Sequence, residues 1–295
     1  MKQISNIDAV VPGLEKHGYI ADRAVATAIY LLVKLQKPLL IEGHAGVGKT
    51  ETANALTSYL GTELIRLQCY EGLDVNSAVY EWNYQKQLLS IKLQEEVVGS
   101  IEEKEKHIFG PEFLLKRPLL RAITAEVAPP VLLIDEIDRA DEEFEAFLLE
   151  LLSDFQISIP EMGTVKAKYV PYVILTSNRT RELSDALKRR CLYHWIDYPS
   201  FEKELQIVHK KIPRIDRDLA AQVVEFIQSV RHKNLSKPPG VAETLDWSAA
   251  LLSLGKQRLD ETTIEETLGC FVKSNEDIIK LKTGGISGIL SNPAC

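Results

Sequence analysis

The sequence predicts an α/β protein in which a parallel sheet of five strands is followed by an all-helical domain. Short apolar runs that end in polar residues alternate with segments of helical periodicity along residues 1–199, which is the pattern of a parallel sheet. A glycine-rich loop joins the first of these runs to the helix after it. Beyond residue 199 the strand-like runs stop. We therefore expect an α/β core domain over residues 1–199 and a helical domain over residues 200–295.

Apolar patterning places the individual elements within these two domains. The expected strands are residues 38–41, 64–68, 131–134, 172–178 and 192–196. Helices are predicted over residues 20–36, 50–60, 142–155 and 183–190 of the core. The second domain is expected to hold helices over residues 201–210, 218–232, 245–256 and 263–282. Its Gly/Ser-rich tail, residues 283–295, is expected to be loosely held.

Two segments interrupt the alternation of strands and helices, and we expect them to be insertions around residues 70–110 and 156–168. The first holds four aromatic residues that form either a partner-binding surface or ordinary packing: Tyr70, Tyr80, Trp82 and Tyr84. Its charge-rich block, residues 95–107, is expected to be a solvated helix or loop. The second insertion alternates around residues 164–165 and predicts a hairpin.

The glycine-rich loop is the strongest chemical signal, because residues 43–50 read G-x-x-x-x-G-K-T. Glycines at this spacing let the backbone turn tightly, so that successive N–H groups point at phosphate oxygens. Lys49 brings a positive charge to the β- and γ-phosphates, and the Thr50 hydroxyl can ligate Mg²⁺. A glycine-rich turn with a surface lysine is the alternative interpretation. The candidate nucleotide-binding residues are Gly43, Ala45, Gly46, Val47, Gly48, Lys49, Thr50 and Glu51.

The second chemical signal is a pair of carboxylates, Asp135 and Glu136, directly after a buried-strand run. Ligands of open α/β sheets bind at the carboxyl ends of the strands, where this pair falls. Asp135 can hold Mg²⁺ through water, and Glu136 can accept a proton from an attacking water. A strand that runs into an acidic helix cap is the alternative interpretation.

Composition restricts the class of protein. Apolar residues make up 45% of the chain and charged residues 26%, as in ordinary globular proteins. The net charge of −7 argues against a surface that binds nucleic acid over its whole extent. The four cysteines lie far apart and are expected to be free thiols. Residues 1–15 lack the apolar segment of a signal peptide, and no apolar run is long enough to cross a bilayer, so we expect a cytoplasmic protein.

Four stretches together resemble the AAA+ ATPases of the MoxR family: GHAGVGKT at residue 43, VLLIDEIDRA at 131, LTSN at 175 and LSDALKRRCLYHWIDYP at 183. Within that family, LIRLQCYEGLD at 64 and VYEWNYQKQLL at 79 are similar to the CoxD type. The resemblance implies a sheet order of 5-1-4-3-2, a C-terminal helical lid, and hexameric rings with ATP and Mg²⁺ bound between subunits. It also implies a von Willebrand factor A-domain partner and a metalloenzyme client of the molybdenum hydroxylase type.

The resemblance also assigns roles to individual residues. Residues 43–50 become the Walker A loop, and Asp135 and Glu136 become the Walker B metal partner and catalytic base. Asn178 becomes the sensor that orients the hydrolytic water. Arg189 or Arg190 becomes the arginine finger that reaches a neighbouring subunit. Arg190 is favoured because it directly precedes a strand, and ordinary pairing of both arginines with surface acids is the alternative.

Two further positions follow from the comparison with the MoxR family. Gln68 stands where the superfamily often has a polar residue that restrains the catalytic glutamate. The lid arginine that usually senses the nucleotide is missing from residues 240–247. Trp247 is therefore expected to pack near the nucleotide. Independently of the resemblance, residues 18–20 precede the first predicted helix and are expected either to line an adenine pocket or to begin that helix against the core.

The resulting functional hypothesis is an ATP-driven remodelling chaperone that assists maturation of a metalloenzyme. The alternative is a nucleic-acid motor or restriction-type translocase on the same core, against which the acidic charge counts. A scaffold that binds nucleotide without hydrolysing it is disfavoured by the Asp135–Glu136 pair. A GTPase is disfavoured because the sequence holds no N-K-x-D motif.

Overall fold

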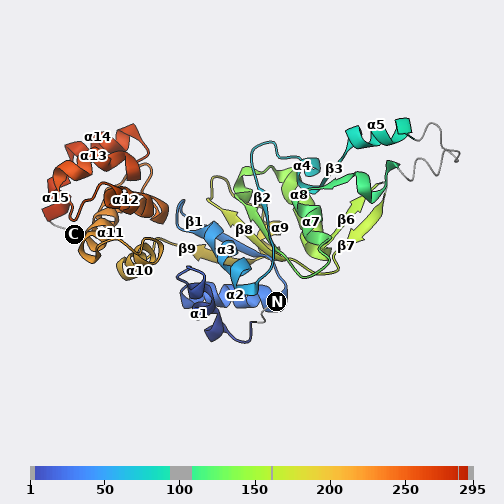
Figure 1. Cartoon of the computed structure of the whole chain (residues 1–295), viewed down its shortest axis with the longest axis horizontal. Helices are drawn as coiled ribbons and strands as arrows, with labels where there is room; N and C mark the ends of the chain where they lie inside the picture. The colour runs from blue at the N-terminus through green and yellow to red at the C-terminus, as the bar shows by residue number, and fades with distance from the viewer. Residues whose placement is uncertain (1–3, 94–107, 161, 285, 292–295) are drawn as a thin grey trace. The chain divides into compact units, whose positions relative to one another are not determined.

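The computed structural model describes residues 4–93, 108–160, 162–284 and 286–291 (Figure 1). The chain divides into two compact units. The first consists of Met1–Val10, Arg23–Glu42 and Ala53–His194, and the second of Val11–Asp22, Gly43–Thr52 and Trp195–Cys295. The glycine-rich loop is thus grouped with the C-terminal helices. The expected division at residue 199 stays a prediction.

A five-stranded sheet forms the centre of the first unit. Its order is β2 (Leu64–Gln68), β5 (Val131–Asp135), β8 (Tyr172–Ser177), β1 (Leu39–Gly43) and β9 (Leu192–Ile196). The ladders β2–β5, β5–β8 and β8–β1 are parallel. Numbered by chain position among these five strands, the order is 2-3-4-1-5, which confirms the expected 5-1-4-3-2 order. All residues of β1, β5 and β8 are buried, as the continuous apolar runs predicted.

Helices pack against this sheet and close its core. They are α2 (Arg23–Leu35), α3 (Lys49–Leu60), α4 (Val75–Val79), α7 (Pro118–Ile123), α8 (Glu142–Asp154) and α9 (Asp185–Arg190). Helix α7 contacts β2 and β5, and α2 contacts β8. Asp141 begins α8 because its carboxylate accepts the N–H of Phe144. The buried face of α8 carries Phe144, Leu148, Leu151 and Leu152, whereas Phe147 and the residue after the helix, Phe155, are only partly buried.

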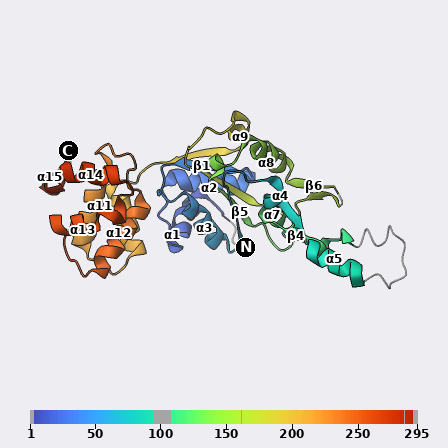
Figure 2. The ribbon, with the colours of Figure 1, turned by 90° about the horizontal axis from the view of Figure 1, so that it is seen from above.

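Short antiparallel pairs carry the two predicted insertions. In the first, β3 (Tyr80–Trp82) pairs with β4 (Leu114–Lys116), and α5 (Tyr84–Leu93) lies beyond this ribbon, away from the sheet (Figure 1 and Figure 2). Trp82 is buried, whereas Tyr70 and Tyr84 are exposed. In the second, β6 (Gln156–Ile159) pairs with β7 (Gly163–Lys166), which confirms the hairpin. The charge-rich block at residues 95–107 lies outside the described residues.

The C-terminal region is helical, as predicted, and its helices share one apolar core. They are α10 (Phe201–Lys211), α11 (Arg217–Arg231), α12 (Val241–Ser253), α13 (Glu261–Phe271), α14 (Asn275–Thr283) and α15 (Ile286–Ser291). The predicted single helix over residues 263–282 was wrong. Val272 leaves the helical conformation (φ −108°, ψ 125°), and Ser274 begins a new helix, so that α13 and α14 are separate.

Two other predictions for this region were wrong. Helix α12 begins at Val241 rather than Leu245, because the Glu243 carboxylate accepts the N–H of Gly240 at 2.9 Å and so satisfies a backbone donor at the start of the helix. The tail is not loosely held where it is described, since Ile286 and Ile289 of α15 are buried in the helical core. Residues 292–295 lie outside the described part of the chain.

Trp247 belongs to the interior of the helical region. Its indole is fully buried, packs against Phe271 with 4.3 Å between ring centroids and a tilt of 42°, and donates a 2.8 Å hydrogen bond from Nε1 to Thr267. The expectation that Trp247 packs near the nucleotide was therefore wrong. An aromatic residue on an apolar helix face is held by its neighbours in the core.

A buried ion pair connects three elements of the helical region. Arg231 of α11 donates two 2.6 Å hydrogen bonds to Glu204 of α10, and the two side chains are 7% and 0% exposed. Thr244 of α12 donates to the same carboxylate at 2.7 Å. Arg231 also donates from Nε to the Pro239 carbonyl at 2.7 Å. Because buried charges require such partners, this network fixes the segment that leads into α12.

We expect Arg231→Met to lower the free energy of unfolding by about 3–5 kcal/mol, because Glu204 would remain buried without its cation. Urea unfolding followed by circular dichroism measures the change. Lys203→Met is the matched control, since its partly exposed pair with Asp22 contributes about 0.2–1 kcal/mol. Equal effects of the two substitutions would contradict this account of the buried pair.

Candidate functional site

The predicted site residues fall into two groups, and each belongs to one compact unit. Loop residues 43–50 and Glu51 lie in the second unit. Asp135, Glu136 and Asn178 lie in the first, together with Arg189 and Arg190.

The backbone of the glycine-rich loop adopts a conformation that requires glycine at several positions. Gly46 and Gly48 have φ angles of 73° and 94°, in the left-handed region that favours glycine. A Cβ on Gly43 would lie 2.2 Å from the carbonyl oxygen of Ile196, so a side chain has no room there. Ala45 and Val47 complete the same loop. These glycines are therefore required by geometry, as the spacing predicted.

Lys49 is buried against its own loop. Its Nζ donates to the carbonyl oxygens of Gly43 at 2.9 Å and His44 at 2.7 Å. The ammonium group is thus held in the concave side of the loop, where a phosphate-binding lysine is needed. Two further loop contacts involve side chains: Glu51 pairs with Lys211, and the Thr52 hydroxyl donates to Tyr19 at 2.9 Å. Burial raises the pKa of Tyr19 to about 12, so the phenol stays protonated.

The first turn of α12 contacts this loop through backbone atoms. The N–H of Ala242 donates to the carbonyl oxygen of Gly46 at 3.1 Å. A Cβ on Gly240 would lie 2.6 Å from the Ala45 carbonyl oxygen and 2.9 Å from the Gly46 Cα. The contact therefore requires glycine at position 240. Residues 240–247 contain no arginine, and it is a backbone N–H of this segment that donates to the loop.

An aromatic stack flanks the loop on another side. The His44 ring lies parallel to the Tyr198 ring with 4.6 Å between centroids, and Trp195 meets His44 edge-on at 5.5 Å. The Arg231 guanidinium lies 4.6 Å from the centroid of Tyr198. The loop is thus connected through His44 and Tyr198 to the buried Arg231–Glu204 pair.

Asp135 is the buried acid of the first unit and is 3% exposed. Its Oδ1 accepts a 2.5 Å hydrogen bond from the Thr176 hydroxyl, and its Oδ2 accepts one of 2.5 Å from Arg66. The described residues contain no cluster of three or more His, Cys, Asp or Glu that would enclose a metal. A single carboxylate is nevertheless the donor that Mg²⁺ uses when nucleotide phosphates and water supply its other ligands.

Glu136 follows Asp135 in a left-handed conformation, with φ 55° and ψ 50°. This backbone is unusual for a residue with a side chain and costs on the order of 1–2 kcal/mol. Its carboxylate accepts hydrogen bonds from Gln68 at 3.0 Å and Asn178 at 3.2 Å, and it pairs with Arg139 at 2.9 Å. The structure thus brings together Glu136, Asn178 and Gln68, which the sequence placed far apart.

Asp138 organises the loop that carries Asn178. Its carboxylate accepts the backbone N–H groups of Asn178 at 3.2 Å and Thr180 at 2.8 Å, and the Thr180 hydroxyl at 2.7 Å. Sequence reasoning gave Asp138 no role. A carboxylate three residues after a buried aspartate carries no signal of its own until the neighbouring strand is known.

Burial raises the pKa of the Cys69 thiol to about 12, and the charges of Asp135, Asp138 and Glu136 add to this shift. Cys69, Cys191 and Cys270 are free thiols, as expected, and Cys295 lies outside the described residues. The raised pKa keeps Cys69 protonated and unreactive.

Arg189 and Arg190 end α9 and are both exposed. Arg190 donates to the Ser153 hydroxyl at 2.9 Å. Within the described part of the chain, no hydrogen bond or ion pair joins either arginine to Asp135 or Glu136. These contacts give neither arginine a role at Asp135 or Glu136 of its own subunit. The arginine-finger role stays a prediction.

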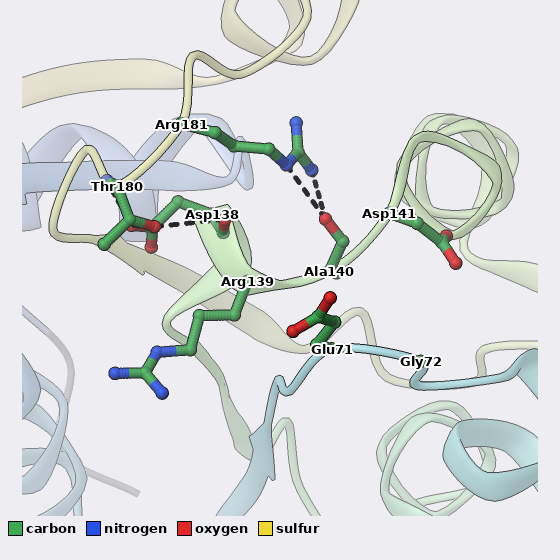
Figure 3. Close-up of a pocket in the computed structure, with 8 residues that line it drawn as sticks. All are labelled: Glu71, Gly72, Asp138, Arg139, Ala140, Asp141, Thr180 and Arg181. Atoms are coloured by element: carbon green, nitrogen blue, oxygen red, sulfur yellow. Dashed lines mark hydrogen bonds between the residues drawn. The ribbon is translucent and has the colours of Figure 1, made fainter.

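A cavity of about 620 Å³ lies next to Asp138, and sequence reasoning did not identify it (Figure 3). Its lining residues are Glu71, Gly72, Asp138, Arg139, Ala140, Asp141, Thr180 and Arg181. Arg181 donates to the Ala140 carbonyl at 3.0 and 2.5 Å and pairs with the buried Glu145. The two arginines that line the cavity are thus each paired with a glutamate, Arg139 with Glu136 and Arg181 with Glu145.

Comparison with known proteins adds a family and a fold. The family described as AAA domain (dynein-related subfamily) matches residues 38–191. An uncharacterised protein of Staphylococcus aureus (strain bovine RF122 / ET3-1) is 27% identical over 81% of this chain and 84% of its own length. An uncharacterised protein of Staphylococcus haemolyticus is 26% identical over 81% of this chain and 85% of its own length. A mutant RuvB of Thermotoga maritima superposes with a TM-score of 0.51 and 16% identity, over 92% of this chain and 83% of that protein, which shows a shared fold.

We expect Gly240→Ala to displace the glycine-rich loop, because the added methyl group would overlap the Ala45 carbonyl. Hydrogen exchange measured by mass spectrometry should be faster in peptides that cover residues 43–50. Gly269→Ala is the matched control, because its Cβ has nothing within 4 Å in α13 and the change favours the helix. Unchanged loop exchange in Gly240→Ala would contradict the proposed contact.

Proposed function

The chain belongs to the AAA domain (dynein-related subfamily) family, and on that premise we propose that it binds ATP with Mg²⁺ and hydrolyses it. The observation that carries this proposal is the environment of Glu136. A carboxylate beside the buried Asp135, within hydrogen-bond distance of Asn178, is suited to accept a proton from a water that Asn178 orients. The loop at residues 43–50 is proposed to hold the phosphates through its N–H groups and Lys49.

The donor set fits magnesium. Mg²⁺ prefers hard oxygen ligands and is usually held by one or two protein groups together with phosphates and water. The Thr50 hydroxyl and the Asp135 carboxylate are proposed as these groups. Bound Mg²⁺ would neutralise the charge that develops on the transferred phosphoryl group.

The residues around Glu136 suggest how the chain controls the attacking water. An ionised carboxylate accepts only, and Glu136 already receives donors from Gln68, Asn178 and Arg139. These three donors take most of the roughly four acceptor sites of a carboxylate, and each of them makes Glu136 a weaker base. We propose that Asn178 stays to orient the water and that Gln68 is the restraint that leaves.

The finer proposal is a remodelling chaperone of the MoxR family and CoxD type that acts as a hexameric ring. The sequence motifs support it, together with exposed Arg189 and Arg190, which are available to a neighbouring subunit. The client would be a metalloenzyme of the molybdenum hydroxylase type, assisted by a von Willebrand factor A-domain partner. Among the described helices, none is long and apolar enough to cross a membrane. We propose a cytoplasmic location.

ATP hydrolysis against protein concentration tests the ring mechanism in wild type, Glu136→Gln and Arg190→Ala. Loss of the base should lower the rate about 10²–10⁴-fold, and loss of an arginine finger about 10³–10⁵-fold. Specific activity should rise with concentration, since each site needs two subunits. A mixture of the two variants should recover activity, because each supplies the group that the other lacks.

Arg189→Ala is the matched control for the finger, since the two arginines are adjacent and both exposed. If Arg189→Ala alone abolishes activity, the finger is Arg189 rather than Arg190. Activity that is independent of concentration and indifferent to both arginines would contradict a shared site. DNA-stimulated hydrolysis would favour a nucleic-acid motor over a chaperone.

A further inference from the structure

We propose that Arg66 of β2 is a positioning residue that competes with the divalent cation for Asp135 and sets the hold of Gln68 on Glu136. This proposal rests on the proposed ATPase function. It gives a role to Arg66, a cation to which the sequence motifs assign none. Its basis is a chain of hydrogen bonds that runs through Asp135, Arg66, Gln68 and Glu136.

The register of the sheet brings these side chains together. In the parallel pair β2–β5, Gln68 stands opposite Asp135 and Arg66 opposite Leu133. Residues two apart in a strand project on the same face, so Arg66 and Gln68 lie side by side. Along β2 the buried positions are Ile65 and Leu67, while Arg66 and Gln68 are exposed. Arg66 therefore reaches along its own strand toward the carboxyl edge of the sheet, where Asp135 lies.

The guanidinium of Arg66 fixes which atoms donate and which accept in this series of hydrogen bonds. Arginine has only donors, so Gln68 meets it with the amide oxygen, at 2.6 Å from Arg66. The amide nitrogen of Gln68 then faces away from Arg66 and donates to Glu136 at 3.0 Å. Arg66 thus selects the orientation of the Gln68 amide in which Gln68 restrains Glu136.

The same guanidinium occupies the Asp135 oxygen that the metal would use. Oδ1 of Asp135 is taken by the Thr176 hydroxyl, and Oδ2 by Arg66 at 2.5 Å. Thr176 is buried in β8 and uncharged, whereas the Arg66 side chain is 51% exposed and can move into solvent. Arg66 is therefore the partner that has to yield when Asp135 takes a divalent cation. Arg66 can leave Asp135 and keep its hydrogen bond to Gln68, so the amide orientation that restrains Glu136 persists when the cation is bound.

The test measures metal affinity, which does not depend on hydrolysis. Binding of a fluorescent ADP analogue is titrated at increasing Mn²⁺, and the Mn²⁺ concentration at half effect is recorded. A half-exposed ion pair is worth about 0.2–1 kcal/mol, so Arg66→Met should lower this concentration about 1.4- to 5-fold. Arg66→Lys should stay near wild type, because it keeps a cation beside Asp135.

The matched control is Arg121→Met. Arg121 is 52% exposed and pairs with Glu63, so it resembles Arg66 in exposure and chemistry but takes no part in the chain to Glu136. It should leave the Mn²⁺ midpoint unchanged. Circular dichroism confirms that each variant is folded.

A kinetic cycle tests the second half of the proposal. With saturating Mg²⁺, Arg66→Met should raise kcat about two- to fivefold by weakening the restraint on Glu136. In a Gln68→Leu background the same substitution should have no further effect, because the amide that it acts through is gone.

The outcomes separate the two proposals. An unchanged Mn²⁺ midpoint in Arg66→Met, with the analogue still bound, would overturn the competition at Asp135. An equal change of kcat with and without Gln68 would overturn the action through that amide. Failure of wild type to bind the analogue at any Mn²⁺ concentration would instead overturn the proposed nucleotide site itself.

Discussion

The buried charge of Asp135 is the constraint on which the rest of the first unit depends. A carboxylate that is 3% exposed has to be compensated by donors, and the sheet order decides where they come from. β2 and β8 flank β5, so the donors are Arg66 on one side and Thr176 on the other. The groups that contact Glu136 follow from the same arrangement, since Gln68 ends β2 and Asn178 follows β8. The burial of Asp135 thus determines which side chains meet at the carboxyl ends of β2, β5 and β8.

Much of this architecture could be predicted from the sequence, because its signals are local. Short segments rich in apolar residues located all five strands, and for residues 64–68 and 192–196 the predicted bounds match those of β2 and β9. The Gly and Lys spacing of the loop is equally local. What could not be predicted is pairing across strands. Arg66, Thr176 and Asp138 are ordinary residues in the sequence, and only the register gives them partners.

The errors in the helical region have the same origin. An apolar periodicity continues across Val272 and Lys273, so nothing short of the packed structure separates α13 from α14. Trp247 was placed by analogy near a ligand, yet Phe271 and Thr267 hold it in the core. The hydrogen bond that starts α12 joins a Gly and a Glu three residues apart, Gly240 and Glu243. Glycine is a weak capping signal, which is why the start of α12 was misplaced.

The meeting of Gly240 with Gly46 has a consequence for how such a chain can diverge. Neither position has room for a side chain, and the two belong to segments far apart in the sequence. A substitution at Gly240 pushes against the loop, and one at Gly46 pushes against α12 and also requires a left-handed backbone. The substitutions that are tolerated at one of these two positions therefore depend on the residue at the other. Relatives that keep this contact should retain both glycines together, and relatives that lose one should have rebuilt the first turn of the helix.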